Sequence, residues 1–153
     1  MNQKELEFIV QQGEGQNIEF KEKLTDIDGE MVAFANASGG KIFLGIADDK
    51  KIKGVTITNK FKSQIQDIAN NCKPKISILF EEFHNILIIT VREGNDKPYE
   101  CSSGYYTRIG PNTQKLTREE LIDFLKTEGK IRFDEFIEPR FEFPKDFGYC
   151  PNL

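Results

Sequence analysis

The chain has 153 residues, of which 38% are hydrophobic and 30% charged, as in a soluble globular protein with one domain-sized core. Its net charge of −4 argues against an extended basic coat for nucleic acid, although a local basic patch is compatible with it. The sequence contains neither an apolar run long enough to span a membrane nor a signal-peptide pattern, so we expect no membrane partner and a cytoplasmic location.

The first half of the chain alternates between helical and extended patterns. Apolar residues at helical spacing predict a helix over 2–12, and strict alternation predicts a strand over 18–21 with Glu19 on a solvent-facing side. A second helix is expected over 25–40, ended by a glycine pair. The nearly continuous apolar run 41–47 then predicts a central strand that is buried on both faces.

The second half of the chain favours one more helix, two hairpins and a final helix. Helical spacing recurs over 59–72, and 75–93 reads as two strands joined by a turn near His84. A second hairpin is expected over 98–109, and a capping box opens a helix within 115–129. This order predicts an α+β (mixed α/β) fold, a two-layer sandwich of helices on a mixed sheet.

The C-terminal segment differs in composition from the rest. Six aromatic residues lie between Phe133 and Tyr149, alternating with charged residues. Such a segment is too apolar for a disordered tail, so we expect it to dock on the core, on a second copy of the chain or on a following domain. The predicted division is a domain over 1–127 and an aromatic extension, or the start of a following region, over 128–153.

The cysteines and the histidine do not indicate a metal or a nucleophile site. Cys72, Cys101 and Cys150 are widely spaced, no CxxC pair occurs, and His84 falls in a predicted turn. We therefore expect packing residues or exposed thiols.

Acidic residues mark the ends of the first two predicted strands. Glu14 precedes the strand 18–21, Glu19 lies on it, and Asp48 and Asp49 follow the next strand. If these strands pair, the carboxylates could converge, and converging carboxylates are the ligands that Mg²⁺ or Mn²⁺ prefers. The alternative is that the glutamates are solvated or paired with lysines and that the aspartates are ordinary turn residues.

Basic and aromatic residues provide candidate contacts for nucleic acid. Arg108 shares a strand face with Tyr106, and an aromatic ring beside an arginine can hold an unpaired base; an ordinary edge strand would show the same pattern. The lysine candidates are Lys21, Lys23, Lys41 and the loop lysines Lys50, Lys51 and Lys53.

Nucleotide-binding loops are not indicated. The segment GEGQNI lacks the third glycine of a dinucleotide fingerprint and precedes a strand, where that fingerprint follows one. In SGGKI the predicted helix comes before the glycines, the reverse of a phosphate-binding loop. ATP binding is therefore not supported.

Three linked motifs resemble one known family. GEGQNIEFKEKL, VAFANASGGKIFLGIADDKKIKGV and KPYECSSGYYTRIGPNTQKLTREEL together are similar to the AlbA-like domain of Schlafen proteins and of bacterial and archaeal transcriptional regulators. The resemblance extends over about residues 5–126. It implies a mixed α/β nucleic-acid-binding module, commonly followed by a winged-helix region in longer regulators.

The resemblance also implies a possible enzyme. In the Schlafen branch the domain is a metal-dependent endoribonuclease with three carboxylates, which by motif position are Glu14, Glu19 and Asp48 here. We therefore expect a DNA-binding module of a transcriptional regulator, using Lys21, Lys23, Lys41, Lys51, Tyr106 and Arg108. The alternatives are a Mg²⁺- or Mn²⁺-dependent ribonuclease, in which Lys21 steadies the developing charge, and a self-association module. A homodimer is expected because the Schlafen enzymes use two such lobes.

Overall fold

The computed structural model describes residues 1–129 of the chain. Within this range the helices are α1 (Gln3–Gln12), α2 (Ile27–Asn36), α3 (Asn59–Asn70) and α4 (Arg118–Thr127). The strands are β1 (Ile18–Lys21), β2 (Gly40–Leu44), β3 (Ile78–Phe83), β4 (Ile86–Val91), β5 (Glu100–Cys101), β6 (Gly104–Ile109) and β7 (Asn112–Lys115).

A four-stranded mixed sheet forms the centre of the fold, in the order β1-β2-β4-β3. The two predicted strands of the first half, β1 and β2, pair in parallel, with Glu19 opposite Ile42 and Lys21 opposite Leu44. The predicted hairpin around His84 is confirmed as the antiparallel pair β3 and β4. β2 ends at Leu44, earlier than predicted, because Gly45 turns the chain with φ 112°.

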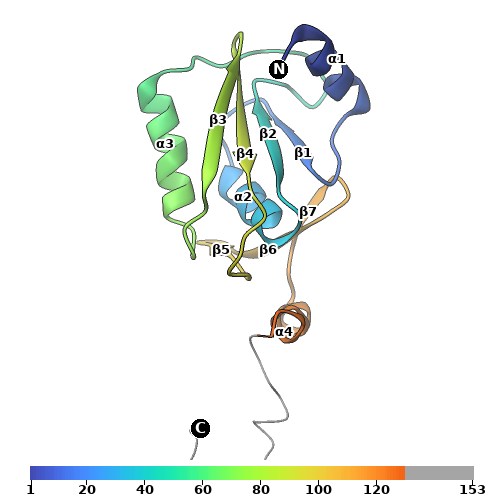
Figure 1. Ribbon diagram of the computed structural model, residues 1–153, viewed down its shortest axis with the longest axis vertical. Coiled ribbons are helices and arrows are strands. Elements are labelled where there is room, and N and C mark those ends of the chain that lie inside the picture. Colours follow the sequence, from blue (N-terminus) through green and yellow to red (C-terminus); the bar gives the residue numbers. More distant parts are fainter. Residues whose placement is uncertain (130–153) are drawn as a thin grey trace, which may run out of the picture. The chain divides into compact units, whose positions relative to one another are not determined.

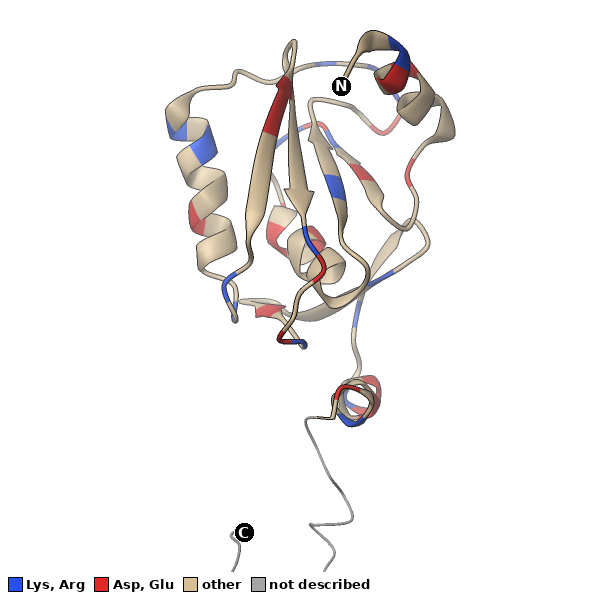
Figure 2. Cartoon of the chain, viewed as in Figure 1, with Lys and Arg blue, Asp and Glu red and all other residues tan. Residues whose placement is uncertain are grey.

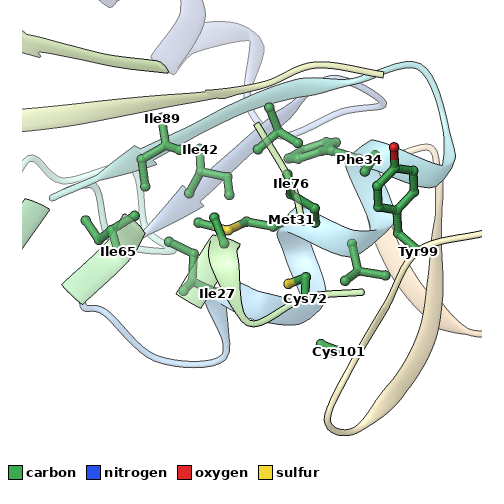
Figure 3. Close-up of a cluster of buried hydrophobic side chains, with 14 of the residues drawn as sticks. Ile27, Met31, Phe34, Ile42, Ile65, Cys72, Ile76, Ile89, Tyr99 and Cys101 are labelled. Carbon is green, nitrogen blue, oxygen red and sulfur yellow. The ribbon is translucent and has the colours of Figure 1, made fainter. Parts of the chain in front are cut away.

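Helix α2 lies between this sheet and a second, three-stranded sheet of β5, β6 and β7. In Figure 1 it passes behind the four-stranded sheet. It is buried on both sides: Met31 and Phe34 pack with Ile42 and Ile89 of the first sheet and with Tyr99 ahead of the second. Figure 3 shows this cluster of apolar side chains around the helix. The predicted α+β class is confirmed. The second sheet adds a layer to the predicted two-layer sandwich, on the other side of α2.

The opposite face of the four-stranded sheet is covered by α1. Leu6 is buried there with Phe20 and Phe43, whose rings meet edge to face at 6.0 Å. Asn2 begins α1 with a capping box, in which its side chain accepts from the amide of Glu5. The alternation of β1 therefore places its aromatic residue toward α1 and its charged residues toward α2.

The glycine pair after α2 allows a close approach of three segments. Gly39 has φ 78°, and an added side chain there would meet the main chain of Val91 at 2.9 Å. At Gly40 an added side chain would lie 2.5 Å from the ring of Phe34. The glycine pair thus ends the helix with a left-handed turn at Gly39 and leaves room for the ring of Phe34 at Gly40.

Strand β7 was not predicted from the sequence. Its residues, NTQK, are polar and carry no apolar alternation. They form a strand because the turn at Gly110 and Pro111 returns the chain along β6, so that Tyr106 lies opposite Lys115. Strand β7 therefore forms because it pairs with β6, and not because of a local sequence pattern.

The described chain forms one compact unit over Met1–Thr117, and a second unit begins at Arg118 and includes α4. The predicted boundary at residue 127 stays a prediction. The aromatic segment from Phe133 to Tyr149 lies outside the described residues. Among residues 1–129, no helix has the length and the apolar character that crossing a membrane would require.

Candidate functional site

Arg108 lies in the interior, where it joins segments that are distant in the sequence. Its side chain is 0% exposed. From β6 the guanidinium donates to the carbonyl of Gly15 through Nε at 3.1 Å and Nη2 at 2.9 Å, and to the carbonyl of Ile18 at 2.8 Å. Arg108 thus fixes the turn that leads into β1.

The other end of the guanidinium meets two carboxylates. Nη1 of Arg108 lies 2.7 Å from Oε1 of Glu19 and 3.3 Å from Oε1 of Glu30 on α2. It also donates to the hydroxyl of Thr113 on β7 at 2.9 Å, and that hydroxyl donates to Glu30 at 2.5 Å. The ring of Phe34 lies 4.9 Å from the guanidinium carbon. Together these contacts join β1, α2, β6 and β7.

This environment corrects the expected surface role of Arg108. We predicted a contact with nucleic acid, but the side chain has no exposed area and its nitrogens are occupied by protein acceptors. Tyr106 on the same face is half-buried against α2, and its hydroxyl donates to Ser103 at 3.0 Å. The pair packs against the helix because that face of β6 points inward.

Glu19 is likewise buried, not solvent-facing as predicted. It faces α2 because its partner in the parallel register, Ile42, belongs to the core around that helix. Burial, followed by the repulsion of Glu30, raises the pKa of Glu19 to about 8, although the hydrogen bond from Arg108 acts in the opposite direction. Glu19 therefore holds a proton more tightly than an exposed glutamate.

The three carboxylates predicted as metal ligands do not form a metal site in this arrangement. Oε2 of Glu14 accepts from the amide of Phe20 at 3.0 Å, and Glu14 also approaches Glu19. Asp48 lies exposed in the turn after β2. Throughout residues 1–129, no group of three or more histidine, cysteine, aspartate or glutamate side chains has an arrangement that could hold a metal ion.

The hydrogen bonds of these carboxylates also argue against a metal site. Oε1 of Glu19 is already paired with the guanidinium of Arg108, and Oε2 of Glu14 accepts from the amide of Phe20, so these oxygens already have partners within the protein. The residues as placed do not fit Mg²⁺ or Mn²⁺. The ribonuclease hypothesis stays a prediction without geometric support.

The predicted lysines do not share one surface. Lys21 lies on the α2 side of β1, where Nζ is 3.4 Å from Oε2 of Glu30. Lys41 is on β2, where alternation turns it to the face opposite Ile42. Lys23 and Lys51 are exposed beyond the ends of β1 and β2. Lys23 and Lys51, like the exposed loop lysines Lys50 and Lys53, have the position that a contact with a large ligand requires.

Asn36 is a structural residue that the sequence interpretation missed. It is 3% exposed, and its amide nitrogen donates to the carbonyls of Tyr99 at 2.9 Å and Tyr106 at 2.8 Å. Its side-chain oxygen accepts from the amide of Tyr99 at 2.6 Å. The available signal was a polar residue at the end of an apolar run within the helix, in the segment MVAFAN.

A family model described as Schlafen, AlbA_2 matches residues 14–117, which is most of the compact unit. The chain belongs to this family. This match confirms the resemblance that the three sequence motifs indicated. It also marks the domain as one related to nucleic acid.

Two solved structures are similar to the Schlafen AlbA_2 chain. The DIP2311 protein from Corynebacterium diphtheriae has a TM-score of 0.54 at 17% identity, over 74% of this chain and 24% of that protein. This likeness supports the fold alone. The N-terminal domain of an ATP-dependent DNA helicase RecG-related protein from Nitrosomonas europaea has a TM-score of 0.46 at 21% identity, over 74% of this chain and 90% of that one.

Proposed function

We propose that the unit Met1–Thr117 is a DNA-binding module of a transcriptional regulator. The contact surface is the lysine edge, which we define as Lys23 together with Lys50, Lys51 and Lys53. The observation that carries the proposal is that these exposed lysines extend from the carboxyl ends of two paired parallel strands. Family membership supports nucleic acid as the partner.

Backbone hydrogen bonds hold the two segments of the lysine edge together. The amides of Gly45 and Ile46 donate to the carbonyl of Lys21 at 2.7 and 3.3 Å. The amide of Lys53 donates to the carbonyl of Gly45 at 2.7 Å, and the amide of Ala47 donates to that of Lys51 at 2.9 Å. The loop after β2 is thereby anchored on the end of β1, which preorganises its lysines.

The charges around the lysine edge set the expected strength of binding. Glu22, Asp48 and Asp49 are exposed in the same two segments, and Lys51 lies 3.9 Å from Asp49. Figure 2 shows basic and acidic positions close together in the loop that follows β2. Since exposed pairs of this kind contribute little, the lysines remain available to phosphates, but binding should be moderate and sensitive to salt.

The test measures affinity against salt concentration. The double substitution Lys51→Gln and Lys53→Gln is expected to lower the slope of log K against log salt by about 2, because each lysine neutralises about one phosphate. Fluorescence anisotropy with duplex DNA and with RNA of the same sequence measures both slopes. An unchanged slope, or the absence of binding, would contradict the proposal, and tighter binding to RNA would contradict the choice of DNA.

The matched control is Lys73→Gln with Lys75→Gln. These exposed lysines precede β3, and β3 runs parallel to β2 because both pair antiparallel with β4. Ile78 and Gly40 both lie opposite Val91, so the control lysines lie at the other end of the sheet. The same loss of charge there should leave the slope unchanged.

A further inference from the structure

Two buried cysteines lie near each other where the end of α3 meets the second sheet. Cys72 follows α3 and Cys101 ends β5, and both thiols are free and nearly inaccessible. They line one pocket of about 320 Å³ that also contains Asp26 and Asp28. Figure 3 shows both residues at the edge of the core around α2.

The backbone brings the two cysteines close to each other. Lys73 and Glu100 form an isolated antiparallel bridge, in which the amide of Lys73 donates to the carbonyl of Glu100 at 2.9 Å and the amide of Glu100 donates to the carbonyl of Lys73 at 2.8 Å. Cys72 directly precedes Lys73 and Cys101 directly follows Glu100, and both line the same pocket. A disulfide requires Cα separations of about 4.4–6.8 Å, a range that residues next to a bridged pair can reach.

The two thiols have different surroundings. Burial, and then the neighbouring Cys101 and Asp28, raises the pKa of the Cys72 thiol to about 12, so Cys72 stays protonated near neutral pH. Its sulfur donates to the carbonyl of Ile68 at 3.4 Å. Cys101 is the more exposed of the two, at 8% against 4%, and its sulfur lies 3.3 Å from the hydroxyl of Ser103.

We propose that Cys72 and Cys101 are a redox pair, which a small neutral peroxide converts to an intramolecular disulfide. The sulfur of Cys101 attacks one peroxide oxygen as its thiol proton leaves, the O–O bond breaks, and a sulfenic acid forms while the departing hydroxide takes up that proton and becomes water. The sulfur of Cys72 then attacks the sulfur of Cys101, the S–O bond breaks, and the thiol proton leaves with the hydroxyl group as water. Two thiols lose two electrons in total, and one hydrogen peroxide becomes two water molecules.

The pocket selects the class of oxidant. Asp26 and Asp28 line it, so an anionic disulfide such as oxidised glutathione meets like charge, whereas hydrogen peroxide is neutral and small. The product would tie the end of α3 to β5 by a covalent bond that encloses the hairpin of β3 and β4. Such a cross-link restricts the unfolded chain, so the oxidised protein should melt at a higher temperature.

The experiment uses the full chain with Cys150→Ser, which leaves Cys72 and Cys101 as the remaining thiols. The reduced, folded protein is treated with hydrogen peroxide, blocked with iodoacetamide in urea and analysed by intact mass and non-reducing peptide mapping. We expect a loss of two hydrogen atoms and one cross-linked peptide pair that contains Cys72 and Cys101. Full alkylation of both residues, or oxidation only to sulfinic acid, would overturn the proposal, as would a disulfide between two chains.

Single variants test the order of the two steps. With Cys72→Ala, Cys101 should accumulate as a sulfenic acid that dimedone traps; with Cys101→Ala, Cys72 should react several-fold less. Equal trapping in both variants would contradict the assignment of Cys101 as the first residue to react. The disulfide itself is tested without these variants, so a variant that fails to fold does not remove the test.

Discussion

At the scale of single residues, Arg108 shows why an arginine can occupy this buried position. Its planar guanidinium presents donors in several directions, and here they reach two backbone carbonyls, a hydroxyl and two carboxylates. A lysine would present one compact charge and leave acceptors around it unpaired. The residue therefore stabilises the junction of β1, α2, β6 and β7.

Replacing Arg108 by alanine should destabilise the protein by about 3–5 kcal/mol, because the buried carbonyls of Gly15 and Ile18 and the carboxyl group of Glu19 would lose their donor. Urea unfolding followed by circular dichroism measures the change. Arg108→Lys, which keeps the charge but not the planar shape, should give an intermediate loss.

The matched control for Arg108 is Arg92→Ala. Arg92 is exposed after β4, so its removal should change the free energy of unfolding by no more than about 0.5 kcal/mol. Equal losses in the two variants would show that the buried contacts contribute no more stability than an exposed side chain does.

At the scale of elements, α2 is held to the second sheet by polar side chains as well as by apolar packing, and Asn36 is the one that bonds to the segment ahead of β5. β5 has two residues, too few for a strand that is stable by itself. Three hydrogen bonds from Asn36 to the backbone of Tyr99 and Tyr106 hold the segments next to β5 in place. An asparagine suits this role because its side chain donates and accepts at once.

Substitution of Asn36 by alanine should loosen the second sheet more than the first. It leaves buried backbone groups unpaired, at a cost of about 1–3 kcal/mol for each unsatisfied group. Hydrogen–deuterium exchange should show faster exchange over β5 and β6, while the amides of β4 change by a smaller factor. Asn70→Ala, on the exposed side of α3, is the control and should leave both sheets unchanged. Uniformly faster exchange in both sheets of the Asn36 variant would contradict this division.

At the scale of the whole molecule, the compact unit ends at Thr117, where the family match also ends. A fragment of residues 1–117 should therefore fold by itself and unfold in one transition, at the same midpoint as the full chain. Differential scanning calorimetry of both proteins makes the comparison. A fragment that lacks cooperative unfolding would show that residues beyond 117 belong to the same folding unit.

The control fragment is 1–109, which removes β7. It takes away Thr113, which bonds to both Arg108 and Glu30, and so opens the buried network to water. We expect this shorter fragment not to fold. Folding of both fragments with equal stability would mean that β7 adds nothing to the network.

The sequence by itself determined most of the elements and the family. Apolar patterns predicted the two strands on either side of α2 and the hairpin at His84, and the three motifs predicted the Schlafen AlbA_2 family. These features are local, since each depends on residues that are neighbours along the chain. The lysines at the ends of β1 and β2 could also be found in this way, because both the strand ends and the charges are visible in the sequence.

Only the tertiary structure decided which polar residues face inward. Alternation shows that Glu19 and Phe20 point to opposite sides of β1, but it does not show that both sides are covered. The second sheet, completed by a strand with no apolar signal, closes over α2 and turns Glu19 and Arg108 into a buried pair. The nearness of Cys72 to Cys101 likewise depends on a bridge between residues 73 and 100. Burial depends on what packs from elsewhere in the chain, which a local pattern does not contain.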